Sequence, residues 1–434
     1  MTNFTEPRKG PYSAERPYDQ SCSSRIKSHS PSDFRVHGGR VFEAARALGR
    51  PWQEIIDFSA NINPLGQPVG LKETLFNDFE RSLHYPEVRA ESLSLRLAEM
   101  IGLAEDHFLA GAGSTPHLHL LPRALGLSRP VVIGPAFAEY EGALARAGLE
   151  AQYILAREED DWLLTRETLE RALKADPDAI FLANPANPTG RLVPGEILEE
   201  LAAECRLRGI WLVLDEAFID FTEPQMGVFT LSGNLNLSQG VAIKCSAEMR
   251  SDQRLSSGNR LASSPTLSSR TLLPLVENNT RLIVLRSLTK IFALPGLRLA
   301  FLAAHPRVMA RMTPLVEPWP LSSQAITAGH FCLSRVGFKE DSLAAVMDFR
   351  QSQRQALEAL NLGRLFPSEC NFMLLKLRSE LESQALIEHL FGCGILVRDA
   401  SNFVGLRPGF IRLAVRPPEE VEALVKGLDA FLSQ

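Results

Sequence analysis

The sequence predicts an α/β protein with a large domain built on a mainly parallel sheet and a smaller α/β domain at the carboxyl end. Three observations lead to this prediction. Short apolar runs alternate with helical patterns between residues 71 and 214. Such alternation implies right-handed crossovers between parallel strands, with helices on both faces of the sheet. A second, shorter alternation follows residue 319, and 434 residues are enough for both domains.

The first 70 residues divide into two parts. Residues 1–33 are rich in Ser, Pro, Arg and Lys with almost no apolar periodicity, so we expect a disordered leader. We expect residues 34–70 to form an N-terminal arm that belongs to the small domain. Within it, the spacing at 42–48 predicts a short helix and the run 55–58 predicts a strand. The density of Asn, Pro and Gly at 59–66 predicts an ordered but irregular loop.

We expect residues 71–318 to form the large domain. Its strands are predicted at 131–133, 179–183 and 210–214, and one long helix is predicted at 192–206. The composition changes abruptly at 224–270, with ten serines between Leu231 and Arg270 and no sustained periodicity. This stretch predicts a surface insertion between two strands, which is tolerated because the entropy cost of closing a loop grows slowly with its length.

Residues 319–434 are expected to form the small domain. Helical patterns predict a long helix at 343–360 and a closing helix at 419–432, and apolar runs predict strands at 372–377, 395–398 and 410–415. In a mainly parallel sheet, ligands bind at the carboxyl ends of the strands. Polar motifs directly after the predicted strands of the large domain are therefore candidates for a ligand site.

The composition excludes several classes of partner. A hydrophobic content of 45% and a net charge of −5 are ordinary for a globular protein and give no reason to expect nucleic acid. Six scattered cysteines without a C-x-x-C pair favour reduced thiols over disulfides or a metal site. No apolar run is long enough to span a membrane, and no signal peptide is evident. We expect a cytoplasmic protein.

The apolar run 282–285 predicts a buried strand that brings Ser287, Lys290 and Arg298 to one place. This order suits a site for pyridoxal phosphate. The lysine amine can form a Schiff base with the cofactor aldehyde, while Ser287 and Arg298 contact its phosphate. The spacing of Ser287 and Lys290 also occurs in serine hydrolases, so the decision depends on the rest of the chain.

A glycine-rich turn at 111–115 precedes a helical stretch at 118–125. Such a turn presents free backbone N–H groups and the positive end of the helix dipole to an anion, and Ser114 or Thr115 can add a hydroxyl. The alternative is an ordinary helix start capped by a serine or threonine.

Two further motifs follow predicted strands. Tyr140 opens a helix, where its ring could lie against one face of the pyridine ring or be a half-buried surface tyrosine. The motif Asn-Pro-Ala-Asn-Pro-Thr-Gly at 184–190 forms a rigid turn. It places an amide where it can bond the ring hydroxyl oxygen of the cofactor, although a turn without a ligand is the alternative.

Asp215 ends the apolar run 210–214. A carboxylate at the end of a buried strand is costly unless it meets a positive partner. A protonated pyridine nitrogen is such a partner, and the pair keeps the ring an effective electron sink. Alternatively, Asp215 caps the next segment.

In their order along the chain, these motifs resemble those of the fold-type I pyridoxal phosphate enzymes of the class I and II aminotransferase family. The likeness covers nearly everything from His37 onward, apart from the serine-rich insertion. It implies that Lys290 is the Schiff-base lysine, Asp215 the partner of the ring nitrogen, Asn187 the contact of the ring oxygen and Tyr140 the stacking residue. It also implies a homodimer in which Tyr85 contacts the cofactor of the neighbouring subunit. The remaining cofactor contacts that it implies come from the same subunit: Ala112, Gly113, Ser114, Ser287 and Arg298.

The resemblance extends to the substrate. Arg412 matches the arginine that grips a substrate carboxylate as a bidentate fork, close to Asn187. His37, Arg398 and Arg416 are candidates for a phosphate on the substrate, although exposed arginines are often merely solvated. Within the family, the chain is similar to members that decarboxylate a phosphorylated amino acid. A histidinol-phosphate aminotransferase, or a related aminotransferase, is the alternative.

Two local features favour the decarboxylase over the aminotransferase. Phe218 stands where many aminotransferases of the group have a tyrosine, and the folded part opens with His-Gly-Gly at 37–39. Two other classes of protein fit less well. A ligand-sensing domain of a transcription regulator needs an N-terminal DNA-binding module, for which the leader is too short and polar. A hydrolase using Ser287 and Lys290 leaves Asp215 unexplained.

Overall fold

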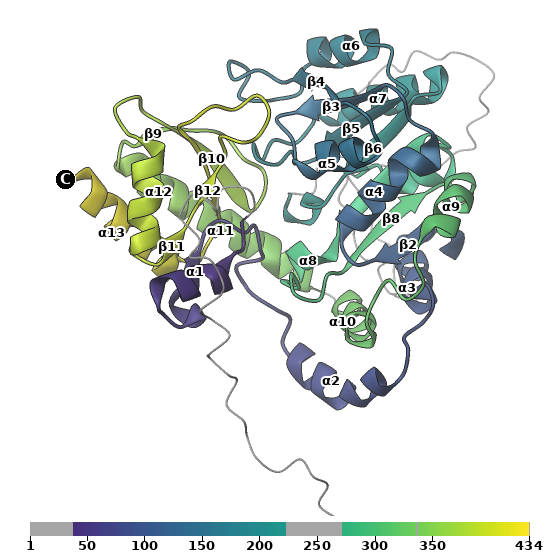
Figure 1. Cartoon of the computed structure of the whole chain (residues 1–434), viewed down its shortest axis with the longest axis horizontal. Helices are drawn as coiled ribbons and strands as arrows, with labels where there is room; N and C mark the ends of the chain where they lie inside the picture. The colour runs from purple at the N-terminus through teal and green to yellow at the C-terminus, as the bar shows by residue number, and fades with distance from the viewer. Residues whose placement is uncertain (1–37, 223–270, 336, 434) are drawn as a thin grey trace, which may run out of the picture.

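The centre of the protein is a seven-stranded sheet with helices on both faces, as seen in a computed structural model (Figure 1). The structure describes residues 38–222, 271–335 and 337–433. The expected leader and the serine-rich insertion lie outside these ranges, as does His37.

The strand order of the central sheet is β2-β8-β7-β6-β5-β3-β4. Its strands are β2 (Phe108–Gly111), β3 (Pro130–Gly134), β4 (Gln152–Leu155), β5 (Ala179–Ala183), β6 (Trp211–Asp215), β7 (Leu282–Ser287) and β8 (Ala300–Ala304). The run from β4 to β7 is parallel, and only β8 is antiparallel to both of its neighbours. The expectation of a mainly parallel sheet is confirmed.

Register within this sheet places the polar ends of the strands together. In the β5–β6 ladder Ala183 pairs with Asp215, and in the β6–β7 ladder Asp215 pairs with Leu285. Every residue of β5, β6 and β7 is buried, as expected of parallel strands covered on both faces. Asp215 and Ser287 therefore end adjacent strands at one edge of the sheet.

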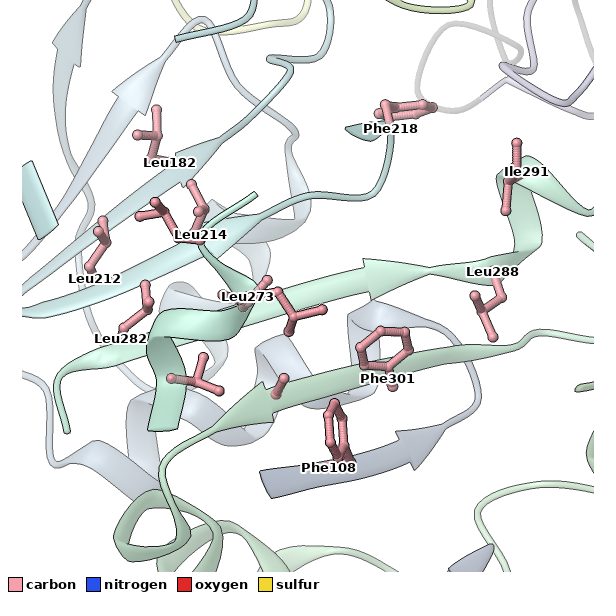
Figure 2. Close-up of a cluster of buried hydrophobic side chains, with 14 of the residues drawn as sticks. Phe108, Leu182, Leu212, Leu214, Phe218, Leu273, Leu282, Leu288, Ile291 and Phe301 are labelled. Atoms are coloured by element: carbon pink, nitrogen blue, oxygen red, sulfur yellow. The ribbon is translucent and has the colours of Figure 1, made fainter. Parts of the chain in front are cut away.

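Helices cover both faces of the sheet. They are α2 (Leu71–Asn77), α3 (Glu91–Ile101), α4 (Ser114–Leu125), α5 (Glu139–Arg146), α6 (Arg166–Lys174), α7 (Gly195–Arg208), α8 (Leu288–Ile291), α9 (Pro306–Met312) and α10 (Ser323–Leu333). One face packs against α3, α6, α7 and α10, and the other against α4, α5 and α9. Figure 2 shows the first of these cores, where leucines of β5, β6 and β7 meet Phe108 and Phe301. This burial supplies most of the driving force that holds the strands in register.

The smaller part is a four-stranded antiparallel sheet in the order β12-β13-β10-β9. Its strands and helices are β9 (Gly363–Leu365), β10 (Phe372–Leu377), β12 (Arg398–Asp399), β13 (Phe410–Ala414), α11 (Phe338–Ala359), α12 (Ser383–Gly392) and α13 (Pro418–Leu432). The helices pack on this sheet through a separate apolar core. The single strand expected at 395–398 is two short strands that belong to different sheets.

The N-terminal segment lies against the smaller part (Figure 1). Its helix α1 (Val41–Leu48) is followed by β1 (Ile56–Asp57), which pairs in parallel with β11 (Ile395–Leu396). This contact agrees in direction with the arm expected at 34–70, while the domain boundaries themselves stay predictions. None of the helices in the described part of the chain has the length and apolar character that a membrane span requires.

A buried ionic network lies directly behind the ends of β6 and β7. The Arg286 guanidinium donates to Glu216 and to Asp220, each at 3.3 Å, and Lys339 of α11 donates to Asp220 at 3.1 Å. Glu216 also accepts the hydroxyl of Thr271 and a backbone N–H. The two carboxylates and two cations balance one another, so the network can remain charged inside the fold.

We expect Arg286→Met to lower the free energy of unfolding by about 3–5 kcal/mol, because the buried Glu216 carboxylate would lose the cation that neutralises it. Denaturant unfolding followed by circular dichroism measures this change. Arg206→Met, on the exposed face of α7, is the matched control and should change it by less than about 0.5 kcal/mol. Equal effects of the two substitutions would contradict the assignment.

Candidate active site

A cavity of about 160 Å³ opens at the carboxyl ends of β5, β6 and β7. Its lining includes Gly113, Ser114, Thr115, Phe137, Tyr140, Asn187, Asp215, Phe218, Ser287, Thr289, Lys290 and Arg298. All the cofactor-binding residues expected from the sequence belong to this lining, except Ala112 and Tyr85. Residues separated by almost 190 positions in the chain thus face one space.

Lys290 reaches the cavity from α8, one turn after β7 ends. The loop at 59–66 holds this turn: Asn63 donates its backbone N–H to the Lys290 carbonyl at 3.1 Å, and its amide to the Ile291 carbonyl at 2.6 Å. Burial lowers the pKa of the Lys290 amine to about 8, and the positive charges of Arg412 and Arg298 act in the same direction. A larger share of the amine is therefore neutral, and so nucleophilic, near neutral pH than for an exposed lysine.

Asp215 lines the same cavity. Its carboxylate accepts the Tyr140 hydroxyl at 2.8 Å and the Ala217 N–H at 3.0 Å. Burial raises the pKa of Asp215, and these hydrogen bonds together with the charge of Lys290 oppose that rise. The arrangement suits a cationic ligand group facing Asp215, because such a group would stabilise the ionised carboxylate.

Tyr140 makes its contact with the site through its hydroxyl rather than through its ring face. The ring is 1% exposed and packs against Phe181, with 6.0 Å between centroids. Phe137 lies perpendicular to Tyr140 and lines the cavity with its own ring. An aromatic face is therefore available to a ligand at Phe137, three residues before the position expected from the sequence.

One end of the cavity is rich in hydrogen-bond donors. Gly113 has φ 89°, and a Cβ at this position would lie 2.3 Å from the Arg298 guanidinium, so only glycine fits. The Ser287 and Thr289 hydroxyls are 2.6 Å apart, and α4 begins at Ser114 with its N–H groups free of helical partners. These groups together suit a phosphate. Ala112 does not line the cavity, although its neighbour Gly113 does.

Asn187 links this cavity to a second one. The Arg412 guanidinium donates to the Asn187 amide oxygen at 2.6 Å and to the Ser59 carbonyl. Because a guanidinium can only donate, the amide NH₂ of Asn187 must point away from Arg412 and is left to donate elsewhere. The Arg412 Nε is buried without a partner among the described residues, so the fork has capacity for a further acceptor.

The second cavity, of about 210 Å³, adjoins the first and shares Phe137, Asn187, Phe218 and Lys290 with it. Its remaining lining is Gly38, Ser59, Ala60, Asn61, Ala138, Arg398, Phe403 and Arg412. Burial lowers the pKa of Arg412 to about 9, with a further contribution from the charge of Arg398, and burial also lowers the pKa of Arg398, to about 10. Two guanidinium groups that repel one another in a common cavity favour an anionic ligand.

Besides Ala112, two of the expected residues that the structure describes lie outside both cavities. Tyr85 is 82% exposed and stacks on Trp319, with 4.6 Å between ring centroids. Arg416 is engaged by Glu420 through two hydrogen bonds of 2.7 and 2.9 Å. His37 lies outside the described residues, although the adjacent Gly38 lines the second cavity.

Several lining residues were missed by sequence reasoning. Thr289 stood inside the Ser-Leu-Thr-Lys motif, where its hydroxyl could have been noticed. Asn61, whose amide oxygen is buried without a partner in the described structure, was treated only as part of a loop. Phe403 follows no sequence motif, and only the packing of the chain reveals it.

The cofactor implied by the sequence, pyridoxal 5′-phosphate, fits the first cavity. A glycine cradle that a Cβ would fill, hydroxyls and Arg298 suit its phosphate. The buried Asp215 carboxylate suits a protonated ring nitrogen, and Lys290, with a lowered pKa, lines the same cavity. The free NH₂ of Asn187 suits the ring oxygen.

A model of the aminotransferase class I and II family matches residues 53–428. The chain therefore belongs to this family. It is 33% identical over 399 residues to the threonine-phosphate decarboxylase of Salmonella typhimurium, covering 92% of this chain and 97% of that protein. It is 27% identical over 402 residues to histidinol-phosphate aminotransferase 2 of Ralstonia nicotianae, covering 92% and 94%.

Solved structures agree with the fold. L-threonine-O-3-phosphate decarboxylase from Porphyromonas gingivalis superposes with a TM-score of 0.67 at 23% identity, covering 88% of this chain and 100% of that chain. The fold class expected from the sequence, that of a fold-type I pyridoxal phosphate transferase, is confirmed.

The lowered pKa of Lys290 predicts how the cofactor-free protein takes up pyridoxal phosphate. Attack on the aldehyde needs the neutral amine, so the rate of appearance of the visible absorption band should rise with pH to a midpoint near pH 8. Below this midpoint it should fall about tenfold per pH unit. Rapid mixing between pH 6 and 10 measures it. Lys339→Ala should keep this profile and Lys290→Ala should give no band, whereas a midpoint near the ordinary lysine value would contradict the prediction.

Proposed function

We propose that this protein is a pyridoxal 5′-phosphate-dependent carboxy-lyase that converts L-threonine O-3-phosphate to (R)-1-amino-2-propanol O-2-phosphate and carbon dioxide, in cobalamin biosynthesis. The observation that carries the proposal is the pair of buried arginines, Arg412 and Arg398, beside Lys290. They suit a substrate with both a carboxylate and a phosphate. The similarity to the Salmonella typhimurium enzyme over nearly its whole length supports the same activity.

Bound pyridoxal phosphate supplies an aldehyde that links to an amine and a ring that takes up the electron pair released at the substrate Cα. Lys290 would hold the cofactor through its amine. Asp215 would keep the ring nitrogen protonated through its negative charge, and Asn187 would donate to the ring oxygen. Ser114, Ser287 and Arg298, with the N–H groups around Gly113, would hold the phosphate.

We propose different roles for the two aromatic residues near the ring. Tyr140, expected to stack, donates its hydroxyl to Asp215 and so fixes the carboxylate that faces the ring nitrogen. Phe137 supplies the face on which the ring lies.

Arg412 and Arg398 orient the substrate. Arg412 binds the substrate carboxylate through its unsatisfied Nε side, and Arg398 binds the substrate phosphate, with Asn61 as a neighbouring polar contact. Anchoring both groups would fix the orientation of the substrate and so select which bond at Cα is broken. The Lys290 Nζ is then placed to deliver a proton to Cα. His37 stays a candidate for the phosphate, and Arg416 is held by Glu420 instead.

Histidinol-phosphate aminotransferase activity is the alternative, because members with that name are also related to this chain. In that reaction Lys290 would remove the Cα proton instead of carbon dioxide leaving. Phe218, whose ring lies 5.9 Å from the Lys290 amine, brings no hydroxyl to the ring oxygen and so favours the decarboxylase.

The purified enzyme with L-threonine O-3-phosphate should release one carbon dioxide per aminopropanol phosphate formed. Transfer of the amino group to 2-oxoglutarate without release of carbon dioxide would contradict the proposed decarboxylase activity and indicate an aminotransferase. Arg412→Ala should lower kcat/KM by about 10²-fold, since hydrogen bonds to a charged group are worth about 1.5–3 kcal/mol. Arg416→Ala, which removes an arginine outside both cavities, should change kcat/KM by less than about twofold.

We also infer a cytoplasmic homodimer in which the Tyr85 hydroxyl reaches the phosphate of the neighbouring subunit's cofactor. Large apolar side chains are exposed along one segment and on a neighbouring loop: Phe76, Phe79, Leu83, Tyr85, Val88 and Trp319. Exposed apolar surface of this extent marks an interface. The described cysteines are free thiols, which agrees with a reducing compartment.

The dimer is tested by light scattering of the purified protein. We expect twice the chain mass for the wild type and a shift toward the monomer for Leu83→Arg, since a charge in an apolar interface is costly to bury. Leu207→Arg, at an exposed leucine on α7 outside that segment, should remain dimeric. A monomeric wild type would contradict the proposal.

A further inference from the structure

The loop between β4 and α6 inserts a tryptophan from the large part into the small part of the protein. Trp162 is 6% exposed, and its ring lies 6.0 Å from the ring centroids of Phe366 and of Phe410. The other members of this separate apolar cluster all come from the small part: Leu374, Ala400, Phe403 and Leu406. Among the residues that the structure describes, Trp162 is thus the single contribution of the large part to this cluster.

The backbone of this loop is held in an unfavourable conformation. Asp161 and Trp162 have φ values of 52° and 61°, in the left-handed region that few residues other than glycine adopt. Such a conformation persists when the surroundings impose it. Two ion pairs to the small part flank the tryptophan: Glu158 with Lys376 at 2.6 Å, and Asp161 with Arg364 at 2.8 Å.

The cluster around Trp162 extends to the substrate side of the site through Phe403, which lines the second cavity. The Arg398 guanidinium lies over the Phe403 ring at 5.0 Å and donates to the Asn402 amide oxygen at 2.8 Å. Gly405, two residues after Phe403, lies close to β4: a Cβ at this position would be 3.0 Å from the Leu155 side chain. The segment that supports Arg398 is therefore packed directly against the large part.

Both arginines lie in the same ladder: Arg398 of β12 pairs with Arg412 of β13, so the backbone fixes where both side chains begin. The guanidinium groups differ in what holds them. That of Arg412 is held by hydrogen bonds to Asn187 and Ser59, whereas that of Arg398 contacts Asn402 and Phe403 in the segment at 400–409, which lies between β12 and β13. Beyond a few backbone hydrogen bonds, this segment is placed by side-chain packing, to which Trp162 contributes from outside the small part.

We propose that Trp162 is a positioning residue for substrate recognition: it holds the segment carrying Asn402 and Phe403, and through them places the Arg398 guanidinium to bind the substrate phosphate. Trp162 itself does not touch the substrate. This inference rests on the proposed function, because it takes Arg398 as the phosphate-binding residue. It predicts that loss of Trp162 weakens binding of phosphorylated ligands and leaves the cofactor end of the site unchanged.

The test is a double-mutant cycle on the holoenzyme with Trp162→Ala and Arg398→Ala. The dissociation constant of L-threonine O-3-phosphate is measured from the change in cofactor absorbance on rapid mixing, which needs no particular reaction to follow. Trp162→Ala should raise this constant about tenfold and leave the spectrum of the free holoenzyme unchanged. In the Arg398→Ala background, the same substitution should have less than a twofold effect, because residues that act through one another are not additive.

Trp52→Ala, which removes a half-exposed tryptophan outside the cluster, is the matched control and should bind as the wild type does. Trp162→Leu, which keeps an apolar side chain in the cluster, should raise the constant about threefold and serves if Trp162→Ala does not fold. Independent, multiplicative effects of Trp162→Ala and Arg398→Ala would overturn the proposal. Unchanged binding in Arg398→Ala alone would show that Arg398 does not bind the substrate phosphate, and this inference would then fail as well. Carbon dioxide release tests the proposed reaction separately.

Discussion

The parallel pairing of β6 with β7 is the constraint on which the site depends. Because both strands run in the same direction and pair in register at Asp215 and Leu285, their polar ends emerge at one edge of the sheet. A carboxylate and, one turn later, an amine are thereby held in the same cavity by two fully buried strands. The strand pairing thus fixes the backbone at Asp215 and at the end of β7, and the hydrogen bonds of Asn63 fix the turn that carries Lys290.

Electrostatics then decides what this cavity can hold. Lys290, Arg298, Arg398 and Arg412 place positive charge around it. Burial is the main cause of the lowered pKa values of Lys290 and Arg412, and the neighbouring positive charges lower them further. The network of Arg286 and Lys339 with Glu216 and Asp220 behind the strands is by contrast balanced. The surplus charge therefore lies on the cavity side, where anionic groups of a cofactor and a substrate can neutralise it.

The site is shared between the two larger sheets of the described structure. The cofactor end is built from the ends of β5, β6 and β7, whereas Arg412 and Arg398 come from the small sheet and Ser59 from the N-terminal segment. Contacts across the boundary, such as Arg412 with Asn187 and Trp162 with Phe410, therefore influence where a substrate can be anchored. Substrate choice depends on packing between the parts as much as on the lining residues themselves.

The sequence alone determined the fold class and the cofactor end of the site. Strand and helix periodicity is local, and motifs such as 184–190 and 287–290 sit directly after the strands that carry them, so neighbours in sequence remain neighbours in space. The alanine-rich β8 was not predicted, because alanine carries little strand preference and the pairing partners supply the conformation. The edge strand β4 was also not predicted: it is only four residues long, although it contains Tyr153 and Ile154.

Only the tertiary structure decided the contacts made between distant segments. In the structure, Tyr140 contacts Asp215 through its hydroxyl, and Arg416 lies beside Glu420 rather than in the cavity. The structure also places Asn61, Phe137 and Phe403 in the cavity lining. These outcomes depend on the direction in which each side chain leaves its element and on partners far away in the chain. No local pattern encodes them, because packing selects among orientations that are equally compatible with the sequence nearby.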